Sequence, residues 1–140
     1  MAEDDLLYVD VVAADRRVWE GEAISVIART TEGDIGIMAN HEPLLAVLVP
    51  CAAEILTADG KREVLAVDGG FISVADNRVA ILSQYGRLAH EILVEEAERE
   101  RRAAWKRMND GDNSEGTRQH FARAHAQLAA AKKAREHQVA

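Results

Sequence analysis

The sequence predicts an α+β fold, with an N-terminal antiparallel β-sandwich of about ten short strands followed by a C-terminal α-helical hairpin. Short β-branched runs alternate with turn residues through the first 88 residues, as in antiparallel sandwiches. From residue 91 the composition shifts to Glu, Arg and Ala, which are good helix formers. Two such runs flank a polar break. We therefore expect a β-sandwich domain over 1–88 and a helix-loop-helix domain over 89–140.

The first strand is expected over 6–12, where alternation places Leu7, Val9 and Val11 on one side. A similar run follows at 22–30. Because the aromatic content is only 4 %, the core of this sandwich must consist mainly of Val, Ile, Leu and Ala.

Two turn signals predict hairpins in the second half of the strand region. Asp59-Gly60 separates two strand-like runs, and this pair favours a two-residue type I′ turn with positive φ at both positions. A second turn is expected at 75–77, between strands at 70–74 and 78–84.

Two helices are expected at 91–108 and 117–137, because neither run contains Pro and the larger apolar residues fall near helical spacing. Asp112 and Glu115 have the spacing of a capping box before the second helix. The apolar stripe of that helix comprises Phe121, Ala124, Leu128 and Ala131. Since large apolar side chains are few, the hairpin is expected to be weakly attached.

Charge and composition exclude several classes of protein. The net charge of -7 disfavours a nucleic-acid binder, which needs a basic surface. The single cysteine, Cys51, excludes an intrachain disulfide, and no run approaches the roughly 18–20 apolar residues of a membrane span. The last 24 residues, 117–140, nevertheless hold five Lys or Arg residues against one Glu. An acidic protein thus ends in a basic helix.

No pattern in the sequence indicates catalytic, metal or cofactor chemistry. His120 and His125 are five residues apart, which misses the spacing that puts two ligands on one helical face. His41, Asp68 and Ser73 lack the G-x-S-x-G context of a nucleophilic serine.

Cys51 has no basic neighbour in sequence to lower its pKa, so we expect an inert thiol. Gly69-Gly70 lacks the frame of a phosphate-binding loop and is interpreted as a pair of turn glycines.

Two longer blocks are specific. The block EGDIGIMANHEPLLAVLVP occupies 32–50, and VDGGFISVADNRVAILS occupies 67–83. With the order of sandwich and hairpin, they resemble the epsilon subunit family of the bacterial F-type rotary ATP synthase over essentially the whole chain. The resemblance implies a central-stalk subunit without catalytic activity that links the gamma subunit to the membrane rotor ring of c subunits. It also implies a peripheral position at the cytoplasmic face of the bacterial plasma membrane, with no direct membrane insertion.

In the first block, Glu32 and His41 match the family pattern and are therefore expected to contact the rotor ring. We add Glu42 from its position beside them, because Pro43 restricts it to extended geometry in a stiff loop. Asn40 stands where relatives commonly have Gly, and Asn tolerates left-handed geometry better than most residues.

Cys51 also departs from the family pattern, in which Gly often follows Pro50. If a positive φ is required there, Cys51 is strained or the local turn differs.

A further departure concerns nucleotide binding. Many relatives begin the first helix with I-D-x-x-R-A, which binds ATP. The aligned positions here are Ile92, Leu93, Glu96 and Ala97, so Leu replaces the Asp and Glu replaces the Arg. Because a carboxylate now stands where a cation faces phosphate, we expect the ATP site to be degenerate.

In the family, extended C-terminal helices meet acidic segments of the beta subunits and block rotation in the hydrolysis direction; alpha subunits are a further candidate contact. The resemblance therefore assigns an inhibitory role to the basic residues of the second helix, namely Arg118, Arg123, Lys132, Lys133 and Arg135. The alternatives are a stand-alone nucleotide-sensing module, which needs a cation near Glu96, and a small hydrolase, which needs a nucleophile and a base.

Overall fold

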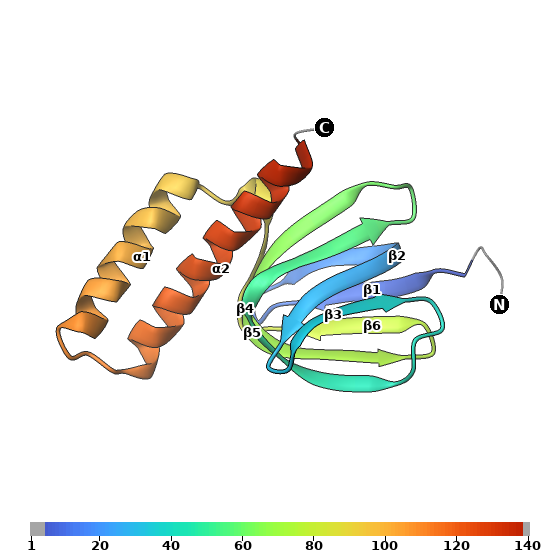
Figure 1. The fold of residues 1–140 in the computed structure, drawn as a ribbon, viewed down its shortest axis with the longest axis horizontal. Helices are drawn as coiled ribbons and strands as arrows, with labels where there is room; N and C mark the ends of the chain where they lie inside the picture. The colour runs from blue at the N-terminus through green and yellow to red at the C-terminus, as the bar shows by residue number, and fades with distance from the viewer. Residues whose placement is uncertain (1–4, 139–140) are drawn as a thin grey trace.

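A computed structural model describes residues 5–138, which include seven strands and two α-helices (Figure 1). The first four residues of the predicted sandwich domain and the last two of the predicted helical domain lie outside the described range. The elements are β1 (Leu7–Val12), β2 (Arg17–Thr30), β3 (Gly33–Met38), β4 (Leu44–Thr57), β5 (Arg62–Ala75), β6 (Arg78–Leu82), β7 (Gly86–Leu88), the 3₁₀ turn η1 (Ala89–Glu91), α1 (Val94–Asn109) and α2 (Glu115–Gln138). The predicted α+β class is confirmed.

The strands form one sheet that folds over on itself. Hydrogen-bonded neighbours follow the order β1-β6-β5-β4-β2-β3, and β7 pairs with β5. Strand β1 also pairs with β2, which closes the sheet on itself. All pairs are antiparallel except β1 and β6, which run parallel. The predicted antiparallel sandwich is confirmed apart from this one pair, in which the N-terminal strand β1 runs parallel to β6.

The structure has seven strands rather than the expected ten, because β4 and β5 each continue through positions where the sequence suggested the end of a strand. Gly69 and Gly70 lie inside β5, at φ of 117° and 107°, so their interpretation as turn glycines was wrong. A Cβ on Gly70 would lie 2.0 Å from the carbonyl oxygen of Leu82. The pair lets two strands approach closely at a bend in the sheet.

Both predicted hairpins are present, but the first turn differs from the expected type I′. At the first, only Gly60 has positive φ, and its N–H donates to the Thr57 carbonyl over 2.9 Å. This is a turn closed by one left-handed glycine rather than type I′. The second hairpin has positive φ at both Asp76 and Asn77, between the paired residues Ala75 and Arg78.

The core lies between the layers of the folded sheet and is aliphatic, as the low aromatic content predicted. The prediction for the first strand is confirmed, because Leu7, Val9 and Val11 are all fully buried. The largest fully buried side chains elsewhere include Ile37, Ile55, Leu65, Ile72 and Ile81.

The helical hairpin packs beside the sandwich through α2, and α1 packs on the far side of α2 (Figure 1). Helix α2 begins at Glu115, two residues before the predicted start, so Gly116 lies within its first turn. The prediction of a capping box formed by Asp112 and Glu115 was wrong. Instead the Thr117 N–H donates to Ser114 Oγ over 3.3 Å, and Asp112 accepts from the Ser114 N–H and the Thr117 hydroxyl.

The predicted stripe on α2 is only partly buried, because the helix faces both α1 and the sheet. Ala124 is buried, whereas Phe121 and Leu128 are half-buried. Ala126 and Ala130 complete the buried set and face the sandwich. Among the described residues, neither α-helix combines the length and the apolarity needed to cross a membrane.

Candidate functional site

The predicted ring-contact residues lie at the β2–β3 turn and in the loop between β3 and β4. Glu32 and His41 line one open groove of about 400 Å³ along β3, although they are nine positions apart in sequence. Glu42 is exposed and does not line this groove. The structure therefore brings two of the three predicted residues together.

The β3–β4 loop is held by a left-handed residue and by a neighbouring turn. Asn40 has φ of 70°, which confirms that Asn supports the left-handed geometry there. Its backbone N–H donates to Asn77 Oδ1 over 2.6 Å, and its amide donates to Asp5 Oδ2 over 3.1 Å. Inside the loop, the ring of His41 hydrogen-bonds the Glu42 carbonyl through Nδ1 over 2.7 Å. These bonds fix the loop as a defined projection.

An exposed apolar row crosses the outer face of the sheet. Val47 on β4 is paired directly with Phe71 on β5, which is paired with Leu82 on β6. Their exposed fractions are 46 %, 52 % and 53 %. We refer to Val47, Phe71 and Leu82 as the apolar row. The row was not predicted from the sequence, because each residue alone fits a strand pattern and only the strand register places the three side by side.

The five basic residues of α2 divide into two groups. Arg123 and Lys133 form ion pairs with buried carboxylates of the sandwich, Asp68 and Glu54 respectively. Arg118, Lys132 and Arg135 are exposed and form no ion pair within residues 5–138.

The positions that align with the ATP motif do come together. Ile92, Leu93, Glu96 and Ala97 all line a shallow pocket of about 160 Å³ at the start of α1. The same pocket is lined by the carboxylates of Glu91 and Glu100, and Arg87 is its one basic residue. The Glu91 carboxylate is paired with Arg16 over 2.9 Å, while Glu96 and Glu100 add negative charge that disfavours a nucleotide phosphate. The aligned positions thus share one pocket, with Glu96 where the motif has its Arg.

The other candidate chemistries do not assemble in the described residues. Asp68 accepts hydrogen bonds from Ser83, Tyr85 and Arg123, so it is engaged away from His41 and Ser73. Within residues 5–138 no three His, Cys, Asp or Glu side chains gather as metal ligands would.

Cys51 has an ordinary backbone conformation, since it is absent from the residues with positive φ, so the strain considered for this position does not arise. Burial raises the pKa of its thiol, which supports the expected inertness.

Comparison with known proteins agrees with this architecture. Residues 6–86 match the family described as the ATP synthase delta/epsilon chain β-sandwich domain. The chain is 51 % identical over 110 residues to the ATP synthase epsilon chain of Cutibacterium acnes, covering 78 % of this chain and 75 % of the relative. It is 55 % identical over 94 residues to the epsilon chain of Streptomyces avermitilis, covering 67 % and 76 %.

Solved structures share the fold at lower identity. A chain of the Euglena gracilis mitochondrial ATP synthase superposes with a TM-score of 0.68 at 21 % identity, covering 95 % of this chain and 81 % of that one. A chain of the Tetrahymena thermophila mitochondrial ATP synthase central stalk and c-ring gives 0.53 at 15 % identity, with coverage of 95 % and 98 %. With the sandwich family matched over residues 6–86 and relatives identical at half of the aligned positions or more, this chain belongs to the ATP synthase epsilon chain family.

Proposed function

We propose that this chain is a non-catalytic central-stalk subunit of a proton-driven rotary ATP synthase. In this role the sandwich joins the gamma subunit to the membrane rotor ring, and the hairpin inhibits ATP hydrolysis. The chain then lies at the cytoplasmic face of the bacterial plasma membrane without inserting into it.

The apolar row is the observation that carries the linking role. Three large apolar side chains lie next to each other on a sheet face that α2 leaves uncovered. Isolated exposed apolar residues are common on soluble proteins, but a contiguous row is typical of a protein–protein contact. We assign this face to the gamma subunit.

The ring-facing end is assigned to the groove along β3 and the adjoining loop. Glu32 and His41 line the groove, while Met38 and Leu45, at the two ends of the loop, are 62 % and 73 % exposed. A rim of polar groups around exposed apolar side chains suits the polar loops of a c-subunit ring. Glu42 remains a proposed contact at the same loop.

The inhibitory role is assigned to residues 89–140, acting as a unit that can leave the sandwich. Helix α2 is basic and rests on the sheet through small side chains, so its release costs little apolar contact. Once extended, Arg118, Lys132 and the other cations of α2 would meet acidic segments of beta subunits, with alpha subunits as a further candidate.

The alternative, a stand-alone nucleotide-sensing module, is less well supported. It requires a cation opposite the nucleotide phosphates, whereas the pocket at the start of α1 is lined by Glu91, Glu96 and Glu100 with Arg87 as its one basic residue.

Reconstitution tests the linking role directly. A synthase stripped of this chain is reconstituted into vesicles with and without the purified chain, and ATP synthesis driven by an imposed proton gradient is measured. We expect the chain to restore coupled synthesis and to co-purify with gamma. Equal synthesis in its presence and absence would contradict the proposed linkage.

A further inference from the structure

The contact between α2 and the sandwich contains little apolar surface. The helix contributes alanines to this contact, and Ala126 and Ala130 pack with Val64 and Ala66 of β5. The partly buried residues that pack against this cluster are Ala52, Tyr85, Ala89, Ile92 and Ala134. An open cleft of about 300 Å³ separates α2 from the sheet beside Glu54. Because alanines bury little area, polar contacts must supply much of what holds the helix in this position.

The first polar contact centres on Asp68, whose side chain is 5 % exposed. Its carboxylate accepts from Ser83 Oγ over 2.9 Å, from the Tyr85 N–H over 3.1 Å and from Arg123 Nε over 2.9 Å. The Arg123 guanidinium also lies over the Tyr85 ring, 5.6 Å from its centroid. Gln127 donates to the hydroxyl of the same tyrosine. One turn of α2 is thereby tied to β5 and to the segment before β7.

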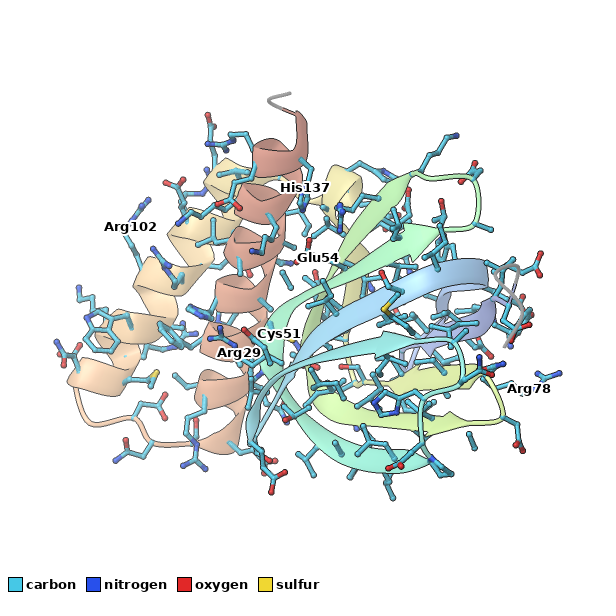
Figure 2. All side chains as sticks on the ribbon, turned by 45° about the vertical axis from the view of Figure 1, so that its right-hand side comes forward. Arg29, Cys51, Glu54, Arg78, Arg102 and His137 are labelled. Atoms are coloured by element: carbon cyan, nitrogen blue, oxygen red, sulfur yellow. The ribbon has the colours of Figure 1, made fainter. Side chains whose placement is uncertain are left out.

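The second contact centres on Glu54, whose side chain is 8 % exposed. His137 Nε2 lies 2.7 Å from Glu54 Oε1 and Lys133 Nζ lies 4.0 Å from Oε2. Arg62 of the sandwich lies 3.7 Å from the same carboxylate. Figure 2 shows Glu54 on the sheet and His137 on α2 in the space between the two.

We propose that Asp68 and Glu54 form an acidic latch that holds the hairpin docked by binding cations of the inhibitory helix itself. The proposal rests on the proposed braking function, because Arg123 and Lys133 belong to the set assigned to the beta-subunit contact. A guanidinium bound to Asp68 is not available to an acidic segment elsewhere. The docked state is therefore a state in which the brake is off, and the sandwich competes with the beta subunits for the same cations.

This competition predicts that variants of the two acids and variants of the helix cations affect inhibition of ATP hydrolysis differently. Asp68→Asn and Glu54→Gln keep the shape and remove the charge that attracts α2, so the hairpin is released with its cations intact. Arg123→Gln also releases the hairpin, but it removes one of the cations that inhibit. The acid variants should thus strengthen inhibition of hydrolysis, whereas Arg123→Gln should not.

Docking is measured first on the isolated full chain, by the distance between spin labels at Ser73→Cys and Asn113→Cys with Cys51 replaced by Ala. Since breaking a buried ion pair is strongly destabilising, we expect the double variant Asp68→Asn, Glu54→Gln to raise the undocked fraction about tenfold or more. Asp10→Asn is the matched control, because Asp10 pairs with Arg17 over 2.9 Å at a site away from α2. Arg123→Gln alters only the helix side and provides a second test that leaves the sandwich unchanged.

Hydrolysis by the assembled synthase is measured next, with the same variants. Undocking together with stronger inhibition supports both the latch and the brake. Undocking without any change in hydrolysis supports the latch and contradicts the braking function. If the double variant and Arg123→Gln give the same distance distribution as the Asp10→Asn control, the latch proposal is overturned whatever the hydrolysis rate.

Discussion

Replacing Phe71 by serine tests the assignment of the apolar row to the gamma subunit. Phe71 is 52 % exposed and is the middle member of the row, paired with Val47 on one side and Leu82 on the other. A phenylalanine buries about 150–250 Å² when fully covered, so the exposed half offers roughly 100 Å² to a partner. At about 25 cal/mol per Å², this area is worth about 2.5 kcal/mol. The expected loss in affinity is about 60-fold.

The assay is calorimetric titration of the purified gamma subunit with the parent and the Phe71→Ser chain. Leu93→Ser is the matched control, because Leu93 is 69 % exposed but lies on the hairpin side. We expect the control to bind within about twofold of the parent, since it removes a similar apolar side chain away from the proposed interface. Thermal unfolding should be little changed by Phe71→Ser, because the ring points out of the core. If Phe71→Ser binds gamma as tightly as the control does, the row is not the interface.

Three further outcomes are expected. Calorimetric titration of the isolated chain with ATP should give no heat at submillimolar ligand, because carboxylates including Glu96 line the pocket; a clear micromolar isotherm would refute this. Changing Arg118, Lys132 and Arg135 to Glu should accelerate ATP hydrolysis by the assembled synthase. The spin-label distance should stay that of the docked hairpin, since these three residues make no ion pair with described residues of the sandwich. Unchanged hydrolysis would mean that their charge is merely solvated. Hydrogen bonds from Thr117 and Ser114 lower the pKa of Asp112 from 3.8 to about 2. The stabilisation of the interhelical loop by the Asp112 carboxylate is therefore complete above about pH 4 and is lost as the pH falls through about 2. An NMR titration of the Thr117 amide should show this loss in the parent chain and not in Asp112→Asn.

Much of the fold was predictable because it depends on local patterns. Alternation identified the buried face of β1, and the change of composition located the hairpin within a few residues. The strand count was too high because a Gly-Gly pair reads as a break in sequence. Whether Gly69 and Gly70 end a strand or bend it depends on the close approach of Leu82, which belongs to another strand.

The candidate site was predictable only where one segment carries it. The four aligned ATP-motif positions lie within one six-residue segment and line one pocket. The apolar row and the acidic latch were not found, because each joins residues from different strands or from a strand and a helix. Asp68 and Arg123, for example, are 55 residues apart, and nothing local marks either as the partner of the other.

The rate of ATP hydrolysis by the assembled synthase, measured with the full chain and with a chain ending at Leu88, tests the braking function most directly. Gamma affinity is measured in parallel, because the apolar row lies wholly within the retained strands. We predict faster hydrolysis with the shortened chain and an unchanged dissociation constant for gamma. Equal hydrolysis rates for the two chains, with gamma bound equally well, would contradict the assignment of residues 89–140 as the brake.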